Sequence, residues 1–296
     1  MTEASATIPV LWHVMDDAFD VKADTRASLL YGDGAWLEGP AYAIQSRQLF
    51  FSDIPRERVL RFDELTTATV VADPASDFAN GRTFDRQGRM VSCLHGSRTI
   101  VRREHDGTVR TLCATFDGAK LNSPNDVVVN AVGEVWFTDP TYGIMSDYEG
   151  YRAPEEQTAR GVYRWREGDE EPSLQIADIA QPNGLAFSPD ESRLYVTDSD
   201  RQRLLVADRV DGFSSTRVLV SGQYGFDGIA VDSAGHIWAA TYEGLSCFAP
   251  DGRELARLAL PQVTSNITFG GLRRNILYIT STTSLYSFSS SATGAL

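Results

Sequence analysis

Six polar residues recur along the chain, each at the start of an apolar stretch and four of them directly before glycine. Successive members are 42, 45, 58, 44 and 39 residues apart. Residues that hold the same place in a structural repeat are brought together when the repeats pack around one axis. We therefore expect a ring of oxygen donors formed by Glu38, Asn80, Asn125, Asn183, Asp227 and Asn266.

A ring of carboxylate and amide oxygens suits a hard divalent cation. Ca²⁺ takes six to eight oxygen ligands in irregular geometry, and Glu38 and Asp227 would balance its charge. Softer metals are disfavoured because the ring contains no histidine or cysteine. The sequence thus predicts one Ca²⁺, with Zn²⁺ or Mn²⁺ as alternatives.

The six positions are not equivalent, because Asn-Gly and Asp-Gly are also common turn dipeptides. Asn125 and Asn183 each follow a proline, and Glu38 precedes Gly-Pro. The predicted metal ligands are Glu38, Asn125, Asn183 and Asp227. Asn80 and Asn266 are expected to line the pocket wall.

Three further residues are expected to line the same pocket. His95 ends a strand before a glycine, Asp139 follows a threonine at a strand end, and Tyr142 comes soon after it. Other chemistry has little support, because the chain lacks G-x-S-x-G, H-E-x-x-H, Walker and G-x-G-x-x-G sequences.

The elements that must position these residues are short β-strands. Apolar and aromatic runs bounded by Gly, Asp, Asn and Pro alternate with hairpin turns throughout. A period of 40–45 residues is typical of a four-stranded propeller blade, whereas a parallel β-helix would have shorter repeats. We predict an all-β, six-bladed β-propeller around a central metal-binding channel. It would be one domain, 1–296, with blades beginning near 38, 80, 125, 183, 227 and 266, and residues 1–30 would pack on or close it.

One interval is longer than the others because the polar, acidic segment 142–160 is inserted in it. Long loops in compact domains are often lids over a site. We expect this insertion to gate the pocket.

Composition excludes several classes of function. A net charge of −13 disfavours binding to nucleic acid or to an anionic membrane. Three cysteines without C-x-x-C indicate buried thiols in a reducing compartment. Since neither a signal peptide nor a membrane-spanning run is seen, we expect a cytoplasmic protein. Its oligomeric state is left open, a homodimer included.

Five motifs in their order and spacing resemble the SMP-30/gluconolactonase family, most of all its bacterial gluconolactonase branch. The family includes regucalcin and diisopropylfluorophosphatase-like enzymes, and the similarity covers roughly residues 30 to 290. The motifs are Glu38-Gly39-Pro40, Ser123-Pro124-Asn125-Asp126, Phe137-Thr138-Asp139-Pro140, Pro182-Asn183-Gly184-Leu185-Ala186-Phe187-Ser188 and Asp227-Gly228-Ile229-Ala230-Val231-Asp232.

The resemblance implies roles for these positions. Glu38, Asn183 and Asp227 would be metal ligands, and Asn125 is a ligand in some members and a substrate contact in others. Regucalcin-like members carry an arginine where this chain has Ser123, so their sugar-acid specificity is not expected here. The metal is Ca²⁺, sometimes Zn²⁺ or Mn²⁺.

The expected activity is metal-assisted hydrolysis of a small lactone such as glucono-1,5-lactone. The cation would polarise the carbonyl, and Asp227 would act as the base toward water, with Glu38 as the alternative base. Two rival functions stay open. One is a phosphotriesterase-like hydrolase with Asp227 as nucleophile, and the other is a non-catalytic ligand- or protein-binding propeller with a structural metal.

Overall fold

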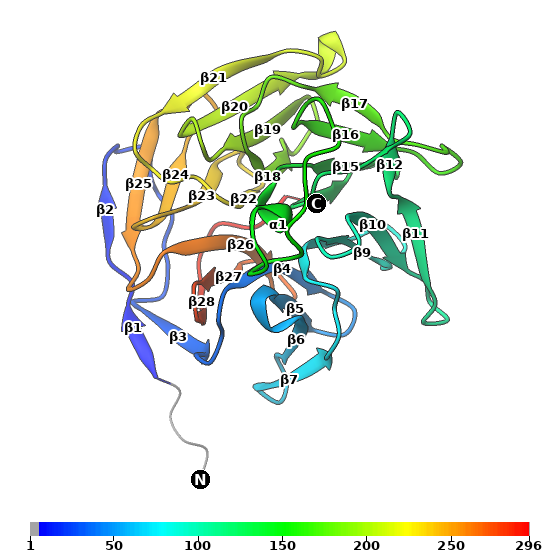
Figure 1. Ribbon diagram of the computed structural model, residues 1–296. Helices are drawn as coiled ribbons and strands as arrows, with labels where there is room; N and C mark the ends of the chain where they lie inside the picture. The colour runs from blue at the N-terminus through cyan, green and yellow to red at the C-terminus, as the bar shows by residue number, and fades with distance from the viewer. Residues whose placement is uncertain (1–5, 296) are drawn as a thin grey trace.

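The fold is built from antiparallel sheets set around a central axis, as the computed structural model shows for residues 6–295 (Figure 1). Six sheets of four or five strands form the blades, which confirms the predicted six-bladed β-propeller. The first three blades lie within residues 37–176. The first has β4 (Leu37–Ala43), β5 (Gln48–Asp53), β6 (Arg58–Asp63) and β7 (Ala68–Asp73). The second has β8 (Ala79–Phe84), β9 (Met90–Leu94), β10 (Thr99–Arg103) and β11 (Val109–Cys113). The third has β14 (Val127–Val129), β15 (Val135–Thr138), β16 (Val162–Trp165) and β17 (Ser173–Ile176).

Residues 182–289 supply the strands of the other three blades that follow in the chain. The fourth has β18 (Pro182–Phe187), β19 (Arg193–Asp198), β20 (Arg203–Asp208) and β21 (Thr216–Ser221). The fifth has β22 (Ile229–Val231), β23 (Ile237–Thr241), β24 (Gly244–Phe248) and β25 (Glu254–Ala259). The sixth has β26 (Thr264–Gly270), β27 (Ile276–Ser281) and β28 (Ser284–Ser289). A separate hairpin joins β12 (Thr115–Phe116) to β13 (Ala119–Lys120), and short 3₁₀ turns lie at η1 (Ile54–Arg56) and η2 (Arg209–Asp211).

The N-terminal segment completes the last two blades. Strands β1 (Thr7–Pro9) and β3 (Arg26–Tyr31) add to the outer edge of the sixth blade, where β3 pairs with β28. Strand β2 (Trp12–Val14) pairs with β25 of the fifth blade. Because the start of the chain pairs with its end, the ring of blades is closed by main-chain hydrogen bonds. Among the described residues, no helix is long and apolar enough to cross a membrane.

The hairpins within the blades follow from their turn residues. In the turn after β8, the Asp85 side chain accepts hydrogen bonds from the main-chain nitrogens of Gln87 and Arg89, both at 2.9 Å. Gly88 then adopts a φ of +78°, in the region that favours glycine. Asn130 and Asp232 form the same turn in later blades. The recurring polar residue and glycine thus set where each inner hairpin reverses.

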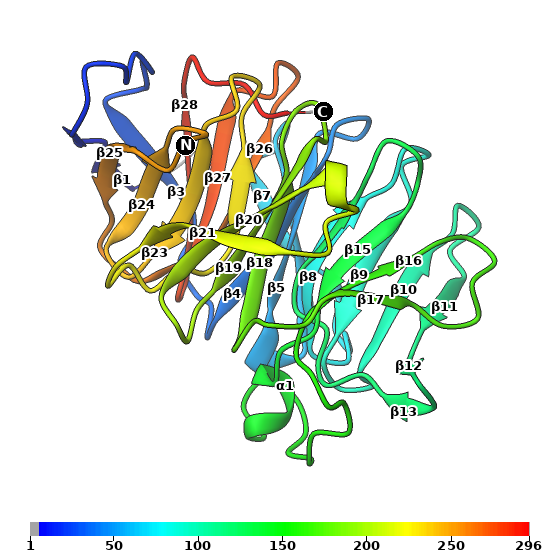
Figure 2. The ribbon, with the colours of Figure 1, turned by 90° about the horizontal axis from the view of Figure 1, so that it is seen from above.

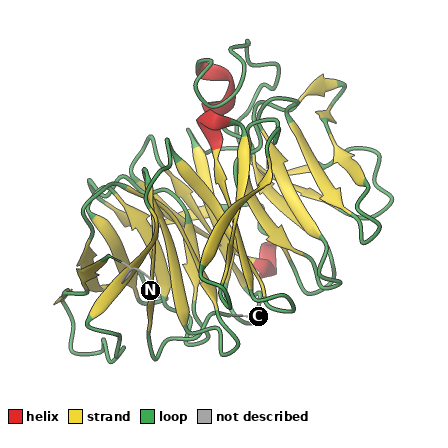
Figure 3. Cartoon of the chain, turned by 90° about the horizontal axis from the view of Figure 1, so that it is seen from below, coloured by secondary structure: helices red, strands yellow, loops and turns green. Residues whose placement is uncertain are grey.

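The two faces of the propeller differ. The insertion after β15 begins with α1 (Tyr142–Met145), which lies over the axis in Figure 1 and projects from one face in Figure 2. The C-terminus lies at the opposite face, as Figure 3 also shows. The core lies between blades, where large side chains such as Trp136, Trp165 and Trp238 are almost completely buried.

Candidate active site

All six recurring polar residues lie at the beginning of the innermost strand of their blade or just before it. Four are within the first three residues of β4, β8, β18 and β26, and Asn125 and Asp227 lie two residues before β14 and β22. Neighbouring innermost strands contact one another around the axis. Five of the six side chains are buried, whereas Asp227 keeps some exposed surface. The six residues therefore belong to one end of the axis, the end that carries the insertion.

Close backbone approach between blades builds this end of the axis. A Cβ atom on Gly39 would lie 2.1 Å from the carbonyl oxygen of Asn80, and one on Gly81 would lie 2.4 Å from that of Asn125. Gly184 abuts the carbonyl oxygen of Asp227 in the same way, and Gly228 abuts the side chain of Asn266. The glycine that follows a ring residue therefore leaves room for the ring residue of the next blade, because it has no Cβ.

Glu38 is held by two hydrogen bonds and lies among other acids. Its Oε2 accepts from its neighbour Gly39 N at 2.6 Å and from Asn266 Nδ2 at 3.0 Å. Burial raises the pKa of Glu38 to about 7, against the lowering effect of these donors and of the Arg82 charge. Arg82 itself donates to the Gly39 carbonyl at 2.8 Å and to the Ser52 hydroxyl, so it is tied to other groups.

Asp227 faces Asn183 and Tyr142. Asn183 hydrogen-bonds to the Asp227 carboxylate and to the Tyr142 hydroxyl, and its Nδ2 lies 3.2 Å from Ser199 Oγ. Enclosure by the site raises the pKa of Asp227 well above its usual range, and the charge of Glu38 raises it further. The structure thus brings together Glu38, Asn183, Asp227 and Tyr142.

His95 connects the ring to the insertion. Its Nδ1 lies 2.8 Å from the main-chain oxygen of Glu149, which can only accept, so Nδ1 carries the proton. Its Nε2 is then free to accept from Asn80 Nδ2 at 3.3 Å. Burial lowers the pKa of His95 to about 4, so the ring is neutral near pH 7. His95 therefore anchors the insertion at Glu149 and orients Asn80.

Asp139 lies behind the ring, a different place from the pocket wall expected of it. Its side chain is completely buried, and Oδ2 accepts from Asn122 N at 2.7 Å. It thereby holds the loop that leads into Asn125, whose own main-chain oxygen accepts from Gly81 N at 2.8 Å. Asn266 also has a positioning contact, since it donates to Glu38.

Glu149 is a site residue that the sequence did not reveal. Burial raises its pKa to about 7, and the charge of Glu38 contributes. Glu149 in turn raises the pKa of Asp227. Glu149 is one acidic residue among several in a polar insertion, and no repeat or motif includes it. The sequence therefore gives no signal that would place it over the axis.

The donor chemistry fits a divalent cation. The negative charges of Glu38 and Asp227 repel each other, so each makes it harder for the other to ionise. A cation held between them would offset that repulsion. Within residues 6–295, no group of three or more His, Cys, Asp or Glu side chains is placed to hold a metal. A site here must therefore mix carboxylate with amide oxygens, as the ring does, and such oxygens suit Ca²⁺.

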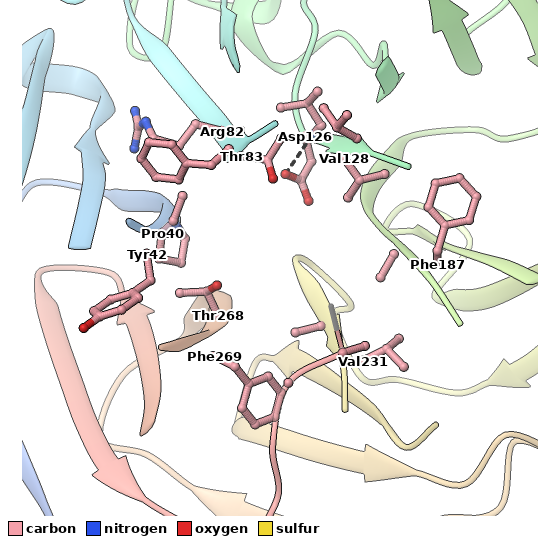
Figure 4. A pocket seen from close by; sticks show the side chains of 18 of the residues that line it. Pro40, Tyr42, Arg82, Thr83, Asp126, Val128, Phe187, Val231, Thr268 and Phe269 are labelled. Atoms are coloured by element: carbon pink, nitrogen blue, oxygen red, sulfur yellow. Dashed lines mark hydrogen bonds between the residues drawn. The ribbon is translucent and has the colours of Figure 1, made fainter. Parts of the chain in front are cut away.

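A cavity of about 490 Å³ runs along the axis beyond the ring. Figure 4 shows its wall, to which Pro40 and Tyr42 of β4, Arg82 of β8, Phe187 of β18 and Asp126, just before β14, contribute. Of the six ring residues Asn266 lines it, and near the opposite face Gly294 and Ala295 do so. The cavity thus continues from the ring toward the C-terminal face.

Comparison with known proteins agrees with this fold. Residues 36–283 match the SMP-30/gluconolactonase/LRE-like region. A gluconolactonase of Zymomonas mobilis is 29% identical over 284 residues, covering 86% of this chain and 78% of that protein. The pentonolactonase XacC of Haloferax volcanii is 31% identical over 254 residues, covering 82% of this chain and 80% of that protein.

Solved structures give the same assignment. The structure of a gluconolactonase from Xanthomonas campestris superposes with a TM-score of 0.89 and 33% identity, covering 96% of this chain and 95% of that one. Since the matching region spans most of the chain, this protein belongs to the SMP-30/gluconolactonase family.

Proposed function

We propose that this protein is a metal-dependent lactonase that opens small sugar lactones such as glucono-1,5-lactone. The observation that carries the proposal is Asp227, a residue that keeps some exposed surface and whose carboxylate is set against Glu38 and Asn183 beneath the insertion. The names of the gluconolactonase and pentonolactonase relatives support the substrate class.

Glu38, Asn125, Asn183 and Asp227 would hold the cation, Ca²⁺ or in its place Zn²⁺ or Mn²⁺. When bound, it supplies Lewis-acid polarisation of the lactone carbonyl. Asp227 takes a proton from the attacking water, whose oxygen bonds to the carbonyl carbon. The ring C–O bond then breaks, and the proton passes to the departing ring oxygen, which becomes a hydroxyl. Tyr142 and Asn80 line the space for the sugar hydroxyls.

The test compares protein freed of metal by chelation with the same protein after addition of Ca²⁺, Zn²⁺ or Mn²⁺. Hydrolysis of glucono-1,5-lactone is followed by acid release, beside a panel of small organophosphates. We expect lactone turnover that metal restores. Full turnover by metal-free protein would refute the metal site. Turnover of organophosphates alone would favour a phosphotriesterase, and metal binding without any turnover would favour a binding propeller.

A further inference from the structure

Three blades end their second strand with a hydroxyl residue followed by aspartate. The pairs are Ser52-Asp53 at the end of β5, Thr138-Asp139, of which Thr138 is the last residue of β15, and Thr197-Asp198 at the end of β19. All six residues have 0% exposed surface. Buried polar side chains are costly unless they are hydrogen-bonded, so their partners indicate what the pairs do.

Each aspartate binds the loop that leads into the ring residue of its own blade. Asp53 accepts from Ala35 N at 2.9 Å and from Trp36 N at 3.4 Å, three and two residues before Glu38. The fourth blade repeats both offsets, since Asp198 accepts from Ala180 N at 3.3 Å and from Gln181 N at 3.2 Å, before Asn183. The third blade repeats the first offset, since Asp139 accepts from Asn122 N at 2.7 Å, three residues before Asn125.

Each hydroxyl reaches forward to the ring residue of the next blade. Ser52 Oγ donates to the carbonyl of Asn80 at 3.0 Å, and Thr138 Oγ1 donates to that of Asn183 at 2.8 Å. Thr197 Oγ1 donates to the carbonyl of Asp227 at 2.8 Å. The main chain of a ring residue is thus fixed by the preceding blade.

In the fifth blade, the hydroxyl residue at the end of the second strand does not donate to the ring residue of the next blade. Thr241 ends β23 and is also buried, but its hydroxyl donates to Gly244 O at 3.0 Å within its own hairpin. The next residue is Tyr242, which is exposed. Thr241 therefore offers a matched control for Thr197.

We propose that the three hydroxyl–aspartate pairs are positioning residues that fix the ring main chain for cation binding. Between them they reach all four residues proposed to hold the cation: the aspartates act on Glu38, Asn125 and Asn183, and the hydroxyls of Thr138 and Thr197 on Asn183 and Asp227. The inference rests on the proposed function, since the ring must bind a cation for its geometry to matter. Groups that orient metal ligands typically change metal affinity 10–100-fold when removed.

The test measures the Ca²⁺ dissociation constant by calorimetry, and the melting temperature, for Thr197→Val, Thr138→Val and Thr241→Val. Each change removes one buried hydroxyl and keeps the side-chain shape. We expect all three to melt somewhat lower, and the first two to bind Ca²⁺ roughly 10–100-fold more weakly, while Thr241→Val binds as the wild type does. Equal affinity in all three variants would overturn the proposal.

Asp139 gives an independent test if a threonine variant does not fold. Asp139→Asn keeps an oxygen that can accept from Asn122 N, whereas Asp139→Ala does not. If Asp139→Ala binds Ca²⁺ weakly and Asp139→Asn binds it nearly as the wild type does, Asp139 acts as a positioning residue. Equal Ca²⁺ affinities of the two variants would contradict that role. A wild-type protein that binds no Ca²⁺ would instead refute the proposed function, and the inference with it.

Discussion

Asn266 Nδ2 donates to Glu38 Oε2 at 3.0 Å, and this bond joins the last blade to the first. The same Asn266 uses its Oδ1 to accept from Ile267 N at 2.8 Å, so its amide is fixed in orientation. The Glu38 carboxylate is therefore oriented by a donor from the last blade, Asn266, and by one from its own blade, Gly39. Preorganisation of this kind lowers the cost of collecting ligands around a cation.

The stability of the metal-free protein should fall as pH rises. Burial raises the pKa of Glu38, Asp126, Asp139 and Glu149 to about 7 in each case, whereas unfolded carboxyls titrate near pH 4. The folded state thus holds protons that the unfolded state has released, and stability declines between about pH 5 and pH 7. Asp227 and His236, whose pKa values are also raised, add to this decline, whereas His95, with its pKa lowered to about 4, acts in the opposite direction.

Melting temperatures from about pH 5 to pH 8, with a chelator and with excess Ca²⁺, check this expectation. With chelator the melting temperature should fall across the range. Added Ca²⁺ should raise it most at the high end, because a bound cation favours ionised Glu38 and stabilises the folded state by mass action. A melting temperature that rises with pH in chelator would show that these carboxyls are not protonated in the folded chain.

Gly81→Ala should disturb the ring. The added Cβ would lie 2.4 Å from the main-chain oxygen of Asn125, which cannot move without shifting its blade. Overpacking of this kind typically costs about 1–3 kcal/mol, and we expect weaker Ca²⁺ binding as well. Gly32→Ala is the control, since its nearest neighbour is a Leu29 side-chain atom at 3.6 Å. Equal Ca²⁺ affinity and melting temperature in the two variants would contradict the argument.

Shortening the insertion should change substrate binding more than folding. Removal of residues 146–152 deletes Glu149 and its contact with His95 but leaves every blade strand in place. We expect KM for glucono-1,5-lactone to rise on the order of ten-fold with a smaller change in kcat, because positioning of the substrate is lost. Kinetics on several lactones, with circular dichroism for the fold, measure this. Unchanged KM values would show that residues 146–152 take no part in substrate binding.

The fold was predictable because its period is visible in the chain. Six polar residues at similar intervals, each before an apolar strand, required a repeat architecture, and the glycines after four of them indicated close packing at the axis. The strand endings Phe51-Ser52-Asp53, Phe137-Thr138-Asp139 and Val196-Thr197-Asp198 also recur. That repeat was open to sequence reasoning, and only the hydrogen bonds reveal its use.

Other parts of the site depend on packing that no local pattern encodes. Asp139 follows a strand end as a pocket residue could, yet its carboxylate turns back onto its own loop. Glu149 is held in place because its main-chain oxygen accepts a hydrogen bond from the side chain of His95, which is 54 residues away in the chain. Long-range contacts of a loop of this kind are fixed by tertiary structure and carry no periodicity.

Asp227 should matter more to turnover than to metal binding or folding. Asp227→Asn keeps the side-chain shape and one carbonyl oxygen but removes the charge and the base. Loss of a general base typically costs ~10²–10⁴-fold in rate. Because an anionic ligand is lost as well, kcat must be measured at saturating Ca²⁺, which restores metal occupancy.

Asn183→Ala is the matched comparison, since it deletes a neutral ligand of the same ring and no base. Excess Ca²⁺ should restore its kcat at least partly, while Asp227→Asn stays slow. Asn183 also bonds to Asp227 and to Tyr142, so its variant retains some loss of orientation. If saturating Ca²⁺ returns Asp227→Asn to near wild-type kcat, Asp227 is a ligand alone. The base is then Glu38, the other carboxylate of the ring, and Glu38→Gln should show the loss that Asp227→Asn did not.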